Sequence, residues 1–131
     1  MTCSSKQDIR SHCPVNYGLE IFGDKWSLLI VRDIVFYGKR TYGQFLKSEE
    51  GFATNILASR LVFLEEQGIL RKTPDPADRR KDFYSLTDKG LDLIPMLLDI
   101  VIWSAKYDPK SYARRRKEFL ARIIKSTQKM S

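Results

Sequence analysis

The segment from Gly51 to Gly90 constrains the fold more than any other part of this 131-residue chain. Leu57, Leu61 and Leu64 recur at spacings of four and three residues, which predicts one buried stripe of an α-helix. Gly68 is expected to end that helix, because glycine adopts the left-handed conformation without a steric penalty. Predicted strands follow at once, so the segment is expected to be a helix leading into a hairpin.

The hairpin is predicted from two runs of strand-forming residues, Ile69 to Thr73 and Lys81 to Leu86. Residues 74–78 contain two prolines and two aspartates, which are typical turn residues. The tip of the hairpin carries three consecutive cations, Arg79, Arg80 and Lys81. Thr87 then follows the second strand as the expected N-cap of another helix.

Further helices are predicted on both sides of this segment. Cys13 is the expected N-cap of a helix to about residue 22, since Pro14 suits a first helical position. Asp24 is expected to cap a buried helix over residues 25–37, and a brief helix is predicted near residues 42–47. This order of helices before a hairpin is typical of a winged helix-turn-helix. The chain is therefore predicted to be mainly α-helical with a small β-hairpin.

Two more helices are predicted after Thr87, at about residues 88–106 and 111–127. Pro95 lies inside the first of them and is expected to kink it, because proline lacks an N–H group. Both helices carry more apolar side chains than one small domain can cover, which predicts a homodimer. The N-terminal helix and these later helices are thus expected to serve dimerisation.

The positive charge is concentrated at the C-terminal end. Residues 106–131 contain nine basic and two acidic side chains, which accounts for the whole net charge of +7. We therefore divide the chain into a flexible N-terminus (1–12), a winged domain with dimerisation helices (13–106) and a basic helical extension (107–131). Three roles remain open for the extension: a dimer clamp, a phosphate-binding element or a contact with RNA polymerase.

The composition argues against several other classes of protein. No stretch approaches the roughly 20 apolar residues that span a membrane, and no signal-peptide core is present, so a cytoplasmic protein is expected. Cys3, His12 and Cys13 lack the spacing of zinc ligands. His12 is the only histidine, and no catalytic triad or phosphate-binding glycine loop is visible. We expect no enzyme activity, no metal and no cofactor.

The helix that begins near Thr54 carries a polar face opposite its leucine stripe. Short side chains near the N-terminus of such a helix are what the major groove of DNA admits. Double-stranded DNA is therefore the predicted partner. The candidate residues on this recognition helix are Thr54, Asn55, Ala58, Ser59 and Arg60.

A second set of residues is predicted to contact the DNA backbone. Polar and basic side chains flank the brief helix near residues 42–47, and the three cations of the hairpin tip would follow the backbone or the minor groove. Arg60 has two alternatives, a phosphate contact or an ion pair with Glu65 or Glu66. The full set of predicted backbone contacts is Lys39, Arg40, Tyr42, Gln44, Arg79, Arg80 and Lys81.

From Cys13 to Trp103, the chain resembles the HxlR-type bacterial transcriptional regulators, a winged-helix family related to the MarR group. The motifs that carry this resemblance are Cys13-Pro14-Val15, Gly23-Asp24-Lys25-Trp26, Arg40-Thr41-Tyr42-Gly43-Gln44-Phe45 and Tyr84-Ser85-Leu86-Thr87, with Gly68, Gly90, Pro95 and Trp103. Ala53 departs from the family, in which a capping serine is common, and the basic extension goes beyond its usual end. The resemblance implies a dimeric repressor or activator on a palindromic operator.

Cys13 is a candidate redox sensor. A thiol at a helix N-terminus meets the positive end of the helix dipole, which lowers its pKa and favours the reactive thiolate. The resemblance also implies that a cysteine in this position can respond to oxidants or electrophiles, and Cys3 could then resolve the oxidised thiol. The alternative is a buried and unreactive packing residue.

Two other functions remain open at this point. A winged domain can serve as a protein-protein adaptor, for which Val62, Phe63 and Glu66 on the recognition helix give some support. The chain could also be a MarR-like regulator that senses a small-molecule effector in a pocket between the hairpin and the dimerisation helices. Neither alternative explains the polar start of the recognition helix together with the basic hairpin tip.

Overall fold

The computed structural model describes residues 9–111. The helix predicted at residues 111–127 falls outside the described residues except for Ser111, and Cys3 lies outside them as well. The predicted fold class is confirmed, since the described part is mainly helical with one two-stranded antiparallel hairpin. The elements are α1 (Pro14–Phe22), α2 (Ser27–Tyr37), α3 (Tyr42–Leu46), α4 (Thr54–Glu66), β1 (Leu70–Pro74), β2 (Asp82–Leu86), α5 (Asp88–Leu91) and α6 (Ile94–Tyr107).

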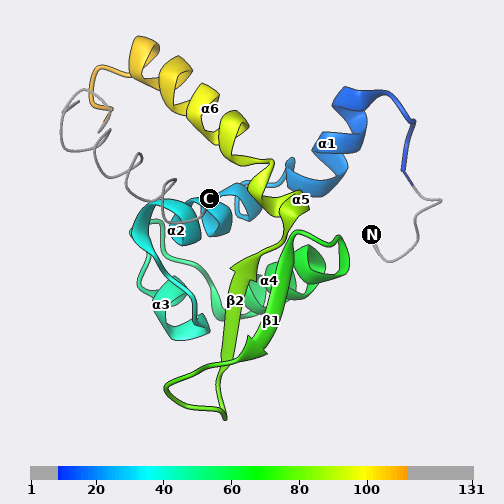
Figure 1. Cartoon of the computed structure of the whole chain (residues 1–131). Helices are drawn as coiled ribbons and strands as arrows, with labels where there is room; N and C mark the ends of the chain where they lie inside the picture. The colour runs from blue at the N-terminus through cyan, green and yellow to red at the C-terminus, as the bar shows by residue number, and fades with distance from the viewer. Residues whose placement is uncertain (1–8, 112–131) are drawn as a thin grey trace.

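Helices α2, α3 and α4 gather beside the hairpin, whereas α1 and α6 extend from the end of the domain opposite the hairpin tip (Figure 1). The core lies where α2, α3 and α4 meet the strands, and Ile30, Val31 and Ile34 of α2 are fully buried there. Phe45 of α3 packs edge-on against Tyr84 of β2, with ring centroids 6.2 Å apart. The prediction that α2 is a buried helix is thereby confirmed.

Helix α4 has the two faces that its sequence predicts. Leu57, Leu61 and Leu64 are buried, while the side opposite them is open to solvent. The helix ends before Gly68, whose φ of 76° is left-handed and whose N–H donates to the Glu65 carbonyl at 3.0 Å. The leucine stripe therefore anchors α4 to the core and leaves its polar face outward.

The hairpin pairs β1 and β2 in antiparallel register from Leu70 opposite Leu86 to Pro74 opposite Asp82. Both strands begin one residue later than predicted. At the tip, the Asp75 N–H donates to the Lys81 carbonyl at 2.9 Å and closes the turn. The other end is anchored because Leu70 and Leu86 are buried, so the basic tip projects from a fixed base.

The helix predicted at residues 88–106 is wrong in one respect, since two helices form instead of a single kinked one. Thr87 caps the short α5 as predicted, and its hydroxyl accepts the Gly90 N–H at 3.1 Å. The chain then turns, and Pro95 lies in the first turn of α6. A proline is tolerated there because the first N–H groups of a helix have no intrahelical partner.

Two smaller predictions also need correction. Helix α2 begins at Ser27 rather than Lys25, although the Asp24 carboxylate accepts the N–H groups of Trp26 and Ser27 at 3.0 and 2.9 Å as a cap would. Residues 38–41 form a turn that touches β2 through one hydrogen bond, from the Tyr84 N–H to the Arg40 carbonyl at 2.7 Å. None of the helices formed by residues 9–111 is long and apolar enough to cross a lipid bilayer.

Candidate nucleic-acid interface

The N-terminal half of α4 presents small polar side chains to solvent. Thr54, Asn55, Ala58 and Ser59 are all exposed on one side of the helix. Ala53 occupies the N-cap and contributes no side-chain hydrogen bond, so the first N–H groups of α4 have no side-chain cap. Such N–H groups at a helix N-terminus can donate to an anion such as a DNA phosphate.

Arg60 has a partner that neither of the predicted alternatives included. Its guanidinium lies 3.7 Å from the carboxylate of Asp24 and 4.6 Å from the ring centre of Phe63. Only about a quarter of the Arg60 side chain is exposed, at 24%. Arg60 therefore fastens α4 to the turn between α1 and α2.

The polar residues before α3 make contacts within the protein. The Gln44 side-chain oxygen accepts the N–H groups of Arg40 and Thr41 at 2.7 and 3.1 Å, and the Thr41 hydroxyl accepts the Gln44 N–H at 3.3 Å. This is a capping box, and the spacing Thr41-x-x-Gln44 was the sequence signal that predicts it. Gln44 thus starts α3, and its predicted contact with phosphate stays a prediction.

Arg40 and Tyr42 also have partners within the chain. The Arg40 guanidinium donates to the carbonyls of Ile34 and Lys39, both at 3.0 Å, and burial lowers the pKa of Arg40. The Tyr42 hydroxyl donates to the Thr54 carbonyl at 3.0 Å. The start of α3 is therefore tied both to α2 and to the first residue of α4.

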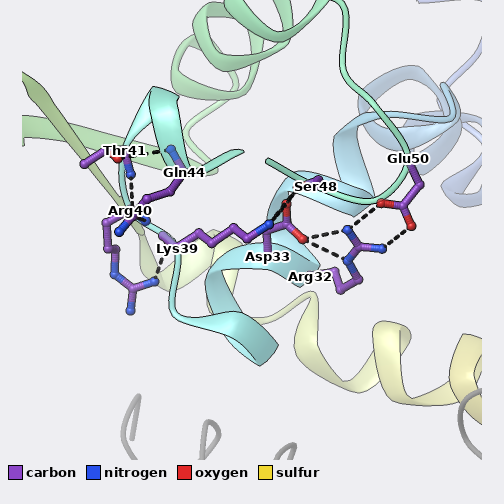
Figure 2. Close-up of polar contacts among 8 residues, drawn as sticks. All are labelled: Arg32, Asp33, Lys39, Arg40, Thr41, Gln44, Ser48 and Glu50. Atoms are coloured by element: carbon purple, nitrogen blue, oxygen red, sulfur yellow. Dashed lines mark hydrogen bonds and ion pairs between the residues drawn. The ribbon is translucent and has the colours of Figure 1, made fainter. Parts of the chain in front are cut away.

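A buried polar cluster lies beneath α3, and sequence inspection did not single it out. We define the Asp33 cluster as Arg32, Asp33, Lys39, Ser48 and Glu50 (Figure 2). Asp33 is fully buried and meets the side chains of Arg32, Lys39 and Ser48. Burial opposes the charge of Arg32, but its hydrogen bonds to Glu50 and Asp33 outweigh that effect and raise its pKa. The same hydrogen bonds from Arg32 lower the pKa of Glu50.

The hairpin tip places its three cations in solvent. Arg79, Arg80 and Lys81 are all exposed. Arg80 lies 3.1 Å from Asp78, which lowers the pKa of that carboxyl group, but the Arg80 side chain remains 90% exposed. An ion pair so open to water is worth little, so it does not prevent Arg80 from reaching another anion.

Cys13 is exposed at the N-cap of α1, which argues against the buried packing role. Hydrogen bonds from the backbone N–H groups of Asn16 and Val15 lower the pKa of its thiol. These groups are the free donors of the first helical turn. The geometry therefore favours the thiolate at Cys13, and its reactivity remains a prediction.

Helices α1 and α6 expose apolar side chains that the core does not cover. Val15 and Leu19 are exposed along α1, and Ile102 and Trp103 are exposed along α6. Trp103 also packs against Tyr107, with ring centroids 5.3 Å apart. Contiguous apolar side chains of this kind on a small domain are typical of an interface with another protein.

The described residues specify neither a ligand nor a metal. An open pocket lies between the C-terminal end of α2 and α6, and its lining combines apolar and oppositely charged side chains. Ile100, Val101, Lys39 and Glu50 are among them, and no single ligand chemistry fits this mixture. Residues 9–111 contain no group of three or more His, Cys, Asp or Glu side chains that could hold a metal ion.

Comparison with known sequences identifies related proteins. A profile of the HxlR-like helix-turn-helix family matches residues 21–112. A helix-turn-helix transcriptional regulator of Mycobacterium tuberculosis is 34% identical over 96 residues, which cover 73% of this chain and 60% of that protein. One from Synechocystis is 35% identical over 86 residues, covering 66% of this chain and 63% of the relative. The chain thus spans less than two thirds of the length of these relatives.

Solved structures with the same fold are also regulators. PA1607, which is classed as a transcription factor, has a TM-score of 0.69 and 42% identity, covering 77% of this chain and 70% of its own. The redox regulator HypR in its oxidised form has a TM-score of 0.63 and 27% identity, covering 72% of this chain and 96% of its own. These proteins are transcriptional regulators rather than enzymes.

Proposed function

Because this chain belongs to the HxlR-like helix-turn-helix family, we propose that it is a transcriptional regulator that binds a palindromic operator as a homodimer. The observation that carries this proposal is the exposed polar face of α4, from Thr54 to Ser59, beside a hairpin tip with three exposed cations. In this proposal, Thr54, Asn55, Ala58 and Ser59 contact base edges. Arg79, Arg80 and Lys81 contact the sugar-phosphate backbone and give no sequence information.

The homodimer is supported by the exposed apolar faces of α1 and α6. Both helices extend away from the hairpin tip (Figure 1), so a partner that covers them leaves α4 and the tip open to DNA. Two-fold symmetry then places the two recognition helices in successive major grooves. The expected operator therefore has two half-sites about one helical turn, roughly 10 bp, apart, and it binds two chains.

Asn55→Ala is expected to reduce the discrimination between operator and mismatched DNA by about 1–3 kcal/mol, because an asparagine amide can bond to two atoms of an adenine edge. The operator is first selected from random duplex DNA, and Kd is then measured for the operator and for an unrelated duplex. Binding to the unrelated duplex should change little. Glu66→Ala serves as the control, since Glu66 is exposed at the other end of α4.

Two results would count against a DNA-binding function. Unchanged discrimination by Asn55→Ala would remove this residue from the interface. Failure to select any duplex from the random pool, even at low salt, would instead favour the adaptor function. The structure weakens the adaptor function in one respect, since Phe63 is buried and only Val62 and Glu66 of that set are exposed.

Redox control through Cys13 is a further part of the proposal. It is supported by the exposed thiol with its lowered pKa and by the likeness to the redox regulator HypR. Diamide, which oxidises thiolates to disulfides, is expected to weaken operator binding by the protein but not by its Cys13→Ser variant. The pH at which alkylation of Cys13 is half-maximal should also lie below that of a simple thiol, because more thiolate is present at a given pH.

Mass spectrometry should accompany the binding measurement, so that oxidation at Cys13 is established independently. A Cys3→Ser variant shows whether Cys3 supplies the second sulfur. If Cys13 is fully oxidised and operator affinity is unchanged, Cys13 has no sensing role. The DNA-binding proposal would stand in that case, since it depends on α4 and the hairpin tip alone.

A further inference from the structure

We propose that Asp33 is a positioning residue for DNA recognition, and that Lys39 acts through the Asp33 cluster rather than on phosphate. The inference rests on the DNA-binding function proposed above. The cluster joins α2 to the two segments that flank α3, so it sets where α3 lies. Because α3 and α4 form one helix-turn-helix, the cluster also sets how α4 meets DNA.

The first part of the argument is that both flanks of α3 converge on one carboxylate. The Lys39 ammonium, which precedes α3, lies 3.6 Å from Asp33 and donates to the Ser48 hydroxyl at 2.9 Å. Ser48 follows α3, and its hydroxyl donates to the same Asp33 carboxylate. Figure 2 shows the Lys39 side chain reaching across to Ser48 and Asp33.

The second part is that Arg32 extends the cluster into the loop before α4. Its guanidinium donates to Asp33 at 3.0 and 2.6 Å and grips both oxygens of Glu50 at 2.6 and 2.9 Å. A two-point contact between guanidinium and carboxylate fixes direction as well as distance. Glu50 is four residues before the start of α4, and Gly51 turns the chain there with a φ of 72°.

The third part is that the cluster has little freedom to rearrange. Asp33 is fully buried, and only 19% of the Arg32 side chain and 21% of the Lys39 side chain are exposed. Removal of one partner leaves a buried charge unpaired, which is unfavourable enough to shift the attached loop. Tyr42 carries such a shift to α4, since its hydroxyl bonds to the carbonyl of Thr54.

The test compares Asp33→Asn, Ser48→Ala and Lys39→Met with a matched control, Lys47→Met, which removes an exposed lysine at the C-cap of α3. Kd is measured for the operator and for an unrelated duplex at several salt concentrations, at a temperature where thermal melts show every variant folded. Each of the three cluster variants is expected to weaken operator binding roughly tenfold, the effect of leaving one buried polar group without its partner. Binding to the unrelated duplex and the slope of log Kd against log salt should stay unchanged, as should all properties of the control.

Three outcomes would overturn the proposal. A salt slope that falls by about 0.9 in Lys39→Met, the amount expected for one phosphate, would mean that Lys39 binds phosphate directly. Equal weakening on both duplexes would indicate a general loss of structure, and unchanged operator binding would leave the cluster without a role in recognition. If the unaltered protein binds no duplex at all, the proposed function fails by itself. Amide hydrogen exchange then tests positioning separately, because faster exchange is expected at residues 48–55 in Ser48→Ala, and equal exchange would refute it.

Discussion

Leu61→Ala is expected to lower the free energy of unfolding by about 2–5 kcal/mol, the usual range for removing a buried leucine side chain from a core. Leu61 is only 2% exposed and belongs to the stripe that anchors α4. Total stabilities of single domains are about 5–15 kcal/mol, so the change would remove a large share. Urea denaturation followed by circular dichroism measures it, and operator binding should weaken as the folded fraction falls.

The matched control is the next residue along the same helix. Val62 is 54% exposed, so Val62→Ala should change stability by no more than about 0.5 kcal/mol. Both substitutions remove apolar volume from α4 and differ in which face they alter. Equal destabilisation by the two variants would mean that α4 does not pack on its leucine stripe, and the polar face would then not point outward.

Replacing the three cations of the hairpin tip together, Arg79→Ala with Arg80→Ala and Lys81→Ala, is expected to have the largest effect on DNA affinity. A cation that neutralises a phosphate releases condensed counterions, so its removal lowers the slope of log Kd against log salt by about 0.9. Removing three such cations from each chain therefore predicts a slope lower by about 2.7 per chain. Stability should be nearly unchanged, since all three side chains are exposed.

A charge-matched control separates local contacts from total charge. Lys25, Lys106 and Lys110 are exposed cations far from the tip in the sequence, and replacing all three with alanine removes the same charge. This control should leave the salt slope close to that of the unaltered protein. If both triple variants lower the slope equally, the hairpin tip makes no specific contact and its cations contribute only to the overall charge.

The sequence predicts the elements of this fold well where short-range interactions determine them. The leucine stripe of α4, the end of that helix at Gly68 and the capping of α5 by Thr87 each depend on residues within a few positions of one another. Pro95 is the informative error. Its missing N–H predicts a disturbed helix, but only the packing of α5 shows that the chain turns and starts again with Pro95 in the first turn of α6.

Sequence by itself also determined which residue types reach solvent near the start of α4 and at the hairpin tip. Only the tertiary structure decided the partners of the charged residues. Arg60 pairs with Asp24, and Asp33 meets Ser48, which lies fifteen positions later in the chain. The physical reason is range: helical periodicity and capping act over three or four residues, whereas an ion pair forms between whichever charges the packed core brings within about 4 Å of each other.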